Sequence, residues 1–239
     1  MPSIKSNAHA ALGLLLAVNL FNYLDRQVLY SLLPLIQSGL HLTDAQGGRL
    51  ASAFMIVYML AAPPIGYWAD RGGRKAWIII GILLWSLAPA ASGLACTYPA
   101  LLCARAAVGI GEACYGAISP SFVAEHFPAP KRGSVLALFS MAIPVGSALG
   151  YIAGGTMGQL FGWRSAFFLV GLPGLLLAAL CLRLPQPPRD ARADAMPAPT
   201  LWGYARLFGI PSFALVTLAG AAMTFALGGF AVWMPTFFV

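Results

Sequence analysis

Long apolar runs, separated by short polar segments, dominate this sequence. They lie near residues 10–33, 48–69, 76–95, 99–124, 132–158 and 163–184, and a further run begins near residue 211. Each of the first six reaches the roughly 20 residues that a helix needs to cross the hydrocarbon core of a bilayer. Two stretches, 50–69 and 165–182, contain no charged residue at all. The pattern therefore predicts an all-α, polytopic membrane helix bundle with six spans, followed by a seventh.

One segment interrupts this pattern and suggests how the chain is divided. The sequence LPQPPRDARADAMPAPT, residues 184–200, is rich in proline, alanine and charge and has no apolar period, as is typical of a linker. We therefore expect a six-span bundle over 1–184, a cytoplasmic linker over 185–206 and the first span of another bundle over 207–239. Residues 1–7 are too short and too weakly basic for a signal peptide, so the first apolar run is expected to be a retained span.

The basic residues predict the orientation of these spans. Twelve of them lie outside the spans, and ten of the twelve fall on one side. This side carries Lys5, Arg71, Arg74, Lys75, Lys131, Arg132, Arg183, Arg189, Arg192 and Arg206, whereas the other side carries Arg49 and Arg164. Cytoplasmic loops of membrane proteins hold the excess of lysine and arginine. We therefore expect a multi-pass protein of the cell (inner) membrane with a cytoplasmic N-terminus.

Composition excludes several other classes of protein. Hydrophobic residues make up 59% of the chain and charged residues 9%, far below the roughly 25% of a soluble domain, so most of the exterior must face lipid. The net charge of +7 follows from topology and does not indicate a nucleic-acid partner. The four cysteines and three histidines show no metal-type spacing. We expect no metal, no cofactor and no catalytic residues: a transporter and not an enzyme.

The loop after the second span reads GYWADRGGRK, residues 66–75. Two successive glycines permit a tight turn, and the basic residues hold the loop on the cytoplasmic side. Asp70 lies at the end of the preceding helix, where its carboxylate can meet neighbouring donors. An ordinary basic loop is the alternative interpretation.

The fourth span carries two charges inside the predicted membrane region. Arg105, Gly109, Glu112 and Gly116 recur at helical spacing and therefore share one face. An intramembrane charge costs about 2.5–3.5 kcal/mol even on translocon scales, so it normally faces a cavity or a partner. A purely structural pair between Arg105 and Glu112 is the alternative, but two turns are a long reach along one helix.

The first span adds a second polar face. Asn19, Asn22 and Arg26 lie within about 60° of one another on a helix, and Asp25 lies at the border of that face. Counting from the cytoplasmic end places Asp25 roughly 22 Å deep. Because the fourth span runs in the opposite direction, Arg105 is expected at a similar depth and Glu112 near the midplane. Polar groups of two spans are thus predicted to meet in one slab, as in a transporter site.

Together, these segments resemble a known family. The sequence GYWADRGGRK matches the G-x-x-x-D-R-x-G-R-[KR] signature of the major facilitator superfamily. NYLDRQ (22–27), RAAVGIGEACYGAISPSFVAEHF (105–127), KRGSVLALFSMAIPVGSALGYIAGG (131–155) and FGWRSAF (161–167) resemble its spinster-like branch. In the fifth span, Pro144 allows a bend and Gly146, Gly150 and Gly154 allow close helix contact. Antiport is not inferred from this glycine–proline pattern, which matches the antiporter motif imperfectly.

The resemblance implies a twelve-span carrier that works by alternating access, with animal relatives that export lysosphingolipids and lysophospholipids. It implies that Asp25 takes up the coupling proton and that Arg105 and Glu112 line the substrate cavity, to which Asn22 and Arg26 contribute; Glu112 is a second candidate for proton coupling. It also implies a cytoplasmic gate. The gate residues would be Asp70, Arg71, Arg74, Glu125 and Arg132.

Seven spans are fewer than the family's twelve, so either the chain is a fragment of a longer protein, which we favour, or a half-size chain dimerises. The expected function is secondary transport of an amphipathic or anionic solute, lysolipid-like by resemblance, coupled to protons across the lipid bilayer. Two alternatives stay open: a small organic-anion symporter and a non-transporting fragment or scaffold.

Overall fold

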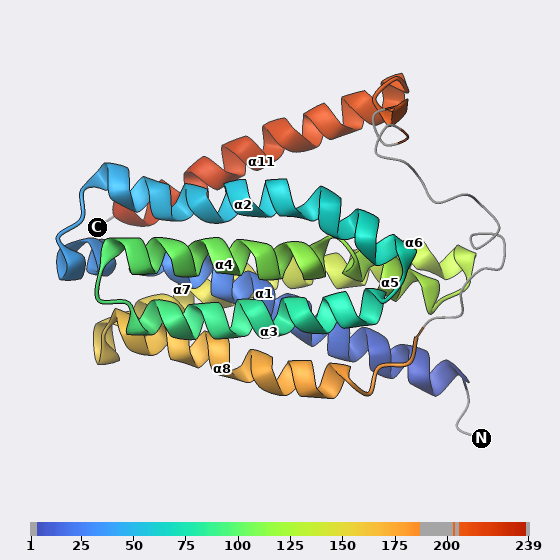
Figure 1. Ribbon diagram of the computed structural model, residues 1–239, viewed down its shortest axis with the longest axis horizontal. Coiled ribbons are helices and arrows are strands. Elements are labelled where there is room, and N and C mark those ends of the chain that lie inside the picture. Colours follow the sequence, from blue (N-terminus) through green and yellow to red (C-terminus); the bar gives the residue numbers. More distant parts are fainter. Residues whose placement is uncertain (1–3, 187–202, 204–205, 238–239) are drawn as a thin grey trace. The chain divides into compact units, whose positions relative to one another are not determined.

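The computed structural model describes residues 4–186, 203 and 206–237, and within them it is built from α-helices (Figure 1). The helices, in chain order, are α1 (Ile4–Leu40), α2 (Asp44–Arg71), α3 (Arg74–Leu94), α4 (Tyr98–Gly116), α5 (Ser119–Glu125), α6 (Ala129–Ser140), α7 (Ala142–Phe161), α8 (Trp163–Cys181) and α11 (Pro211–Phe237). Side-chain caps define two of the starts. Thr43 and Gln46 form a capping box at α2, and the Thr97 hydroxyl accepts from the Ala100 N–H at α4.

Seven spans of membrane-crossing length and composition arise from these helices, which confirms the predicted all-α membrane bundle. Two of the spans are interrupted. The fourth consists of α4 and α5 with a break at Ala117 and Ile118, and the fifth consists of α6 and α7 with a break at Met141. Each break lies two or three residues before a proline, Pro120 or Pro144, whose ring crowds the preceding turn and which has no N–H to donate to it.

Close backbone contacts hold the first six spans together. In this bundle α1 packs along α7, α3 lies between α4 and α8, and α2 packs against α4. Glycines make the approach of α7 to α1 possible, as the small-x-x-x-small spacing predicts. A Cβ at Gly146 would lie 2.6 Å from the Leu20 carbonyl oxygen, and one at Gly150 would lie 2.5 Å from that of Leu24.

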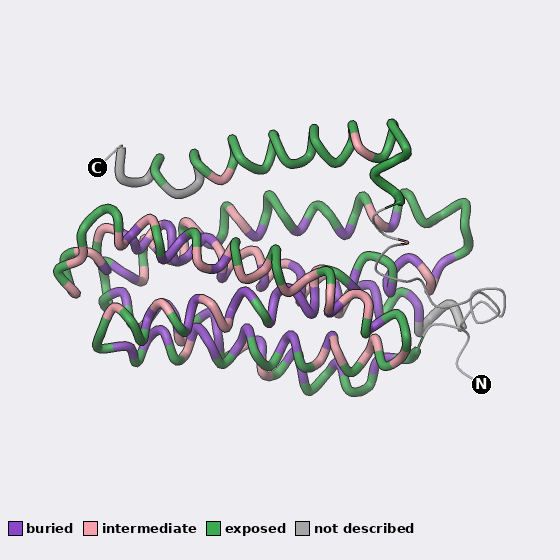
Figure 2. The backbone as a smooth tube through the Cα atoms, turned by 45° about the horizontal axis from the view of Figure 1, so that its top comes forward, coloured by how far each residue is buried: buried purple, intermediate pink, exposed green. Residues whose placement is uncertain are grey.

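Many positions along the spans are exposed (Figure 2), and large side chains at these positions are often apolar, as a lipid-facing surface requires. Large hydrophobic side chains are exposed along several helices, among them Leu60, Leu94, Leu160 and Leu176. The buried side chains of the described residues are mostly apolar as well, and a small polar group that includes Asp25, Arg105 and Glu112 lies among them. An apolar exterior of this kind agrees with a chain that spans a membrane.

The chain divides into two compact units, 1–188 and 189–239. The second unit contains α11, a long apolar helix whose described side chains are almost all exposed within the unit. The expected linker over 185–206 lies mostly outside the described residues. The predicted boundaries of the six-span bundle, the linker and the following span therefore stay predictions.

Candidate functional site: a buried charge cluster

Four charged residues meet inside the six-span bundle and form what we call the charge cluster: Asp25 and Arg26 of α1 with Arg105 and Glu112 of α4. Asp25, Arg105 and Glu112 are at most 1% exposed, and the Arg26 side chain is 20% exposed. The cluster lies in the middle of two long apolar helices, where no other charged side chain of the described residues is buried. The structure thus brings together the polar groups that the sequence predicts in one slab.

The charges pair between helices and not along one helix. The Arg26 Nη2 group donates a hydrogen bond to Glu112 Oε2 and thereby joins α1 to α4. The Arg105 Nη1 atom lies 4.0 Å from Asp25 Oδ2. The alternative of a structural pair between Arg105 and Glu112 is therefore not what the structure contains, since each finds its counter-charge on α1.

The two ion pairs of the cluster differ in their hydrogen bonding. The Arg26–Glu112 pair is hydrogen-bonded, whereas the Arg105–Asp25 pair is only in ion-pair range. Within the described residues, neither Asp25 oxygen has a hydrogen-bond partner, and the same holds for the Nε and Nη1 atoms of Arg105. A buried carboxylate without donors is expensive as an anion, because the lost hydration is not replaced. Asp25 and Arg105 therefore have more atoms without a hydrogen-bond partner than the other two residues of the charge cluster.

Aromatic rings surround the arginines. The Arg26 guanidinium carbon lies 5.0 Å from the ring centre of Tyr23, 4.8 Å from that of Phe54 and 5.9 Å from that of Tyr58. Phe54, which is buried in α2, also lies 5.8 Å from the Arg105 guanidinium carbon. The negative faces of these rings stabilise the cations. These aromatic residues are not predicted from the sequence, although Phe54 and Tyr58 are four residues apart in the charge-free stretch 50–69 and so share one helix face.

Glycines of α4 bring α2 and its aromatic rings to the cluster. A Cβ at Gly109 would lie 2.7 Å from the Phe54 carbonyl oxygen, and one at Gly116 would lie 2.7 Å from the Tyr58 hydroxyl. The face of α4 that carries these glycines therefore packs against α2. Its two charged residues, Arg105 and Glu112, form ion pairs with α1.

The polar residues of α1 also hold the two interrupted spans. The Asn19 side-chain amide donates to the Phe139 carbonyl oxygen, 3.0 Å away and close to the break between α6 and α7. The Tyr115 hydroxyl, next to the break between α4 and α5, donates to the Leu15 carbonyl oxygen at 2.8 Å. Asn22 is buried beside Glu112. One stretch of α1 thus contacts both breaks and the charge cluster.

The predicted gate residues gather at one end of the bundle. We call this the basic end; it comprises residues 70–75, 125–132 and 182–185. Here Arg74 Nη1 donates to Glu125 Oε1 at 2.7 Å and joins α3 to α5. Arg132 Nε donates instead to the Phe127 carbonyl oxygen, and Arg71 lies over the ring of Tyr67.

The turn at the basic end needs its glycines. Gly72 and Gly73 have φ values of 153° and 78°, which L-residues with side chains rarely adopt. Asp70 is exposed in the last turn of α2, just before them. The predicted tight turn is therefore present, and the structure joins two members of the predicted gate, Arg74 and Glu125, directly.

Residues 15–239 match the sequence pattern of the Major Facilitator Superfamily. The chain belongs to this superfamily. Within the superfamily it is similar to a protein named spinster homolog 1 from Bos taurus, with 38% identity over 97% of this chain and 46% of the relative. It is also similar to a protein of Danio rerio named sphingosine-1-phosphate transporter, with 34% identity over 96% of this chain and 47% of the relative.

The structural comparison agrees with this superfamily membership. The chain is similar to a crystal structure described as a bacterial homolog to the human lysosomal transporter spinster, in an inward-facing and unoccupied conformation. The two superpose with a TM-score of 0.82 at 28% identity, and the match covers 98% of this chain and 56% of that chain. The resemblance to the spinster-like branch, first inferred from short motifs, is thus confirmed. The chain spans about half the length of the curated relatives that it matches.

In the part of the chain that the structure describes, no group of three or more histidine, cysteine, aspartate or glutamate side chains could hold a metal ion. The cysteines are free: Cys114 and Cys181 are buried between helices, whereas Cys96 and Cys103 are exposed.

Proposed function

We propose that this protein contributes to a secondary active transporter that moves an amphipathic anion by alternating access, coupled to protons. The observation that carries the proposal is the charge cluster, and within it the Arg105–Asp25 pair. A membrane bundle that buries two carboxylates and two arginines bears a large desolvation cost, which a purely structural role does not require. A substrate and proton site would account for it.

The geometry of the cluster supports an exchange of partners. The Arg105 guanidinium has N–H groups without hydrogen-bond partners among the described residues, so it can donate to a phosphate or carboxylate in the planar, forked manner that arginine favours. When an anion takes Arg105, Asp25 loses its nearest counter-charge. Protonation then becomes the less costly way for this carboxyl group to stay buried. Substrate binding and proton uptake would thereby be linked.

The proposed substrate is an anion with an apolar part. Arg105 and Arg26 supply the positive charge, and the faces of Tyr23, Phe54 and Tyr58 supply apolar surface beside it. A lysolipid or sphingolipid phosphate has both features, and one similar protein of Danio rerio bears the name of such a transporter. A small organic anion, such as a carboxylate or a sugar phosphate, is the alternative because it would need only the arginines.

We further propose that the basic end is a cytoplasmic gate in a cell-membrane protein. Its Arg74–Glu125 ion pair connects α3 to α5, next to the glycine turn that follows Asp70. Such pairs can break and re-form as a bundle rocks, and Arg71 and Arg132 are close enough in sequence to exchange into them. The curated relatives are about twice as long, so further helices of the same protein, or a second copy, would complete the cavity.

The test is solute flux in proteoliposomes that contain the complete protein, with and without an imposed pH gradient. Sphingosine-1-phosphate and a short organic phosphate serve as the two probes. Asp25→Asn imitates the protonated carboxyl group, so we expect it to keep exchange of the transported probe and to lose accumulation driven by the gradient. Gradient-driven accumulation at the wild-type level in this variant would show that Asp25 is not the coupling acid.

The controls separate the alternatives. Flux of neither probe in well-folded wild-type protein would favour a scaffold role, and flux of the short phosphate alone would favour the organic-anion symporter. Asp44→Asn, an exposed acid at the start of α2, removes the same charge outside the cluster and should leave coupling unchanged.

A further inference from the structure

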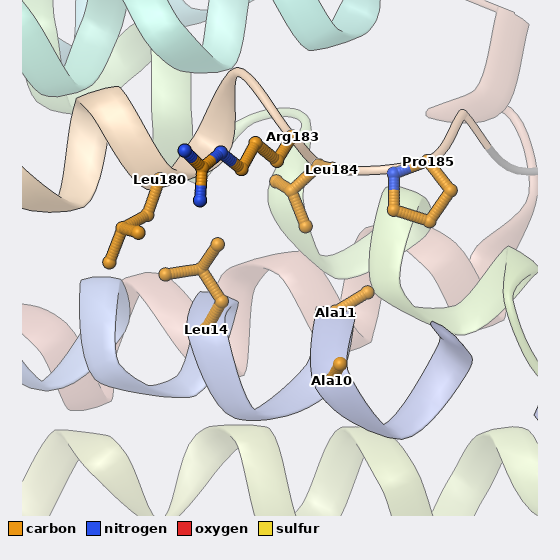
Figure 3. Close-up of a pocket in the computed structure, with 7 residues that line it drawn as sticks. All are labelled: Ala10, Ala11, Leu14, Leu180, Arg183, Leu184 and Pro185. Atoms are coloured by element: carbon orange, nitrogen blue, oxygen red, sulfur yellow. The ribbon is translucent and has the colours of Figure 1, made fainter. Parts of the chain in front are cut away.

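A groove lies away from the charge cluster, between the first turns of α1 and the end of α8 (Figure 3). Its volume is about 410 Å³, within the size range of sites for small ligands. Ala10, Ala11 and Leu14 of α1 line one side, and Leu180, Arg183 and Leu184 of the α8 end line the other. The lining is apolar except for one guanidinium.

Arg183 is the charged residue that lines this groove and can bind an anion. Arg183 is exposed, but its side chain turns back along α8 toward Leu180 and places the guanidinium over Leu14, at the groove and not past the helix end (Figure 3). No described residue makes an ion pair or a side-chain hydrogen bond with Arg183. A cation held against leucines without a counter-ion attracts an anion that carries its own apolar part.

Its basic neighbour is already engaged. The Lys75 ammonium group donates to the carbonyl oxygens of Leu182 and Leu184, each 2.7 Å away, and thus satisfies the end of α8. Arg183 is therefore the cation of this groove that remains available to a ligand.

The depth of the groove identifies the occupant. The membrane-length helix α8 ends at Cys181, two residues before Arg183, so this side of the groove lies where hydrocarbon gives way to headgroups. Basic pockets between helix ends at this level bind anionic headgroups, and in the orientation proposed above this end of the bundle faces the cytoplasmic leaflet, which is rich in anionic lipid. We propose that this groove binds an anionic phospholipid of the bilayer, with its phosphate on Arg183 and an acyl chain along Leu14 and Leu180.

Several features favour a lipid over a free phosphate. The leucines would gain nothing from an inorganic ion, whereas each buried methylene of an acyl chain contributes about 0.8 kcal/mol. The groove is also open at the bundle surface, since Ala10 and Leu180 are exposed, so a lipid can enter sideways from the leaflet. The proposal does not depend on the transported solute, because no residue of the charge cluster lines the groove.

The experiment measures lipid binding to the complete purified protein in a non-ionic detergent by native mass spectrometry. Dioleoyl phosphatidylglycerol is the anionic probe and dioleoyl phosphatidylcholine is its zwitterionic match. We expect wild-type protein to prefer phosphatidylglycerol, and R183Q to weaken its binding about fivefold or more, as the loss of one lipid-facing arginine predicts. K131Q removes the same charge from an exposed position at the basic end, outside the groove, and should keep wild-type affinity.

A second variant tests the groove without changing its charge. A10F places a ring in the groove from an exposed position and should weaken binding of both lipids while Arg183 remains. Equal affinity of wild type and R183Q would overturn the proposal, as would an equal loss in K131Q or full binding in A10F. Displacement of the lipid by millimolar inorganic phosphate would also overturn it, since the site would then be one for free anions.

Discussion

Asp25 and Arg26 are neighbours on α1, yet each has its counter-charge on α4. Because the two side chains leave the helix about 100° apart, they reach different turns of α4, seven residues from each other. This arrangement leaves one pair hydrogen-bonded and the other loose. At the residue scale the cluster therefore has a fixed part, Arg26 with Glu112, and a part that is free to change partners, Arg105 with Asp25.

The fixed part can be tested through its counter-charge. Glu112→Gln leaves the Arg26 cation without its buried carboxylate, which should lower stability by up to about 3 kcal/mol and weaken substrate binding because Arg26 loses its position. The double variant Arg26→Gln with Glu112→Gln removes the stranded charge. We expect it to regain thermal stability but not substrate affinity, measured by thermal unfolding in detergent and by ligand binding. Recovery of both properties would mean that the pair is only structural.

Phe54 offers a test of the aromatic contribution. Its ring lies beside both guanidinium groups, so Phe54→Met keeps apolar volume but removes the π-face, at a cost of about 0.5–2 kcal/mol for the cations. We expect a several-fold rise in KM for the anionic solute with little change in maximal flux. Phe54→Tyr keeps a π-face and should stay close to wild type. An equal rise in both variants would assign the effect to packing and not to the ring.

At the scale of the elements, α1 joins the charge cluster to both interrupted spans. It packs along α7, contributes half of the charge cluster and binds both interrupted spans through Leu15 and Asn19. The glycines of α7 permit this contact because their missing side chains let the two backbones meet.

Substitution of two glycines of α7 can distinguish loss of close packing against α1 from the general effect of alanine on helix stability. A Cβ at Gly150 would lie 2.5 Å from the Leu24 carbonyl oxygen, whereas one at Gly155 would meet nothing within 4 Å. Gly150→Ala should therefore destabilise the bundle by about 1–3 kcal/mol, and Gly155→Ala should be neutral or slightly stabilising. The measurement is the midpoint of thermal unfolding in detergent. If both variants shifted it alike, the α1–α7 contact would not be the limiting one.

The spans and one of the two helix breaks can be predicted from the sequence. Helical periodicity places Arg105 and Glu112 on one face, and apolar length predicts the spans, because both depend on local geometry. Pro144 likewise predicts the bend near Met141. The break before Pro120 is not predicted, although the same physical reason applies to it.

The partners within the charge cluster are harder to predict than its members. Which carboxylate meets which arginine depends on how α1 and α4 lie relative to each other, and glycines hold each of them against a third helix, α1 against α7 and α4 against α2. The position of Phe54 beside the arginines is hard to predict for the same reason. An aromatic residue in an apolar run is expected to face lipid, and only the packing of α2 against α4 shows that it faces the charge cluster. The roles of Asp25, Arg105 and Glu112 in transport remain predictions, since they concern motion as well as position.

At the scale of the whole molecule, the remaining question is which end of the bundle faces the cytoplasm. The basic end carries Arg71, Arg74, Lys75, Lys131 and Arg132, and the turn between α3 and α4 lies at the opposite end. Positive residues are retained on the cytoplasmic side during insertion. The orientation with the basic end inside is therefore the one that we expect.

The chain provides its own control for a labelling test of that orientation. Cys96 is exposed in the turn between α3 and α4, whereas Arg71 and Lys131 are exposed at the basic end. With Cys103, Cys114 and Cys181 replaced by alanine, a membrane-impermeant maleimide added to intact cells should label Cys96. With Cys96 also replaced, a cysteine introduced at position 71 or 131 should react only after the cells are made permeable, since both positions would face the cytoplasm. Labelling of position 71 from outside, with Cys96 protected, would reverse the topology and place the Arg74–Glu125 ion pair on the external side, where it could not act as a cytoplasmic gate.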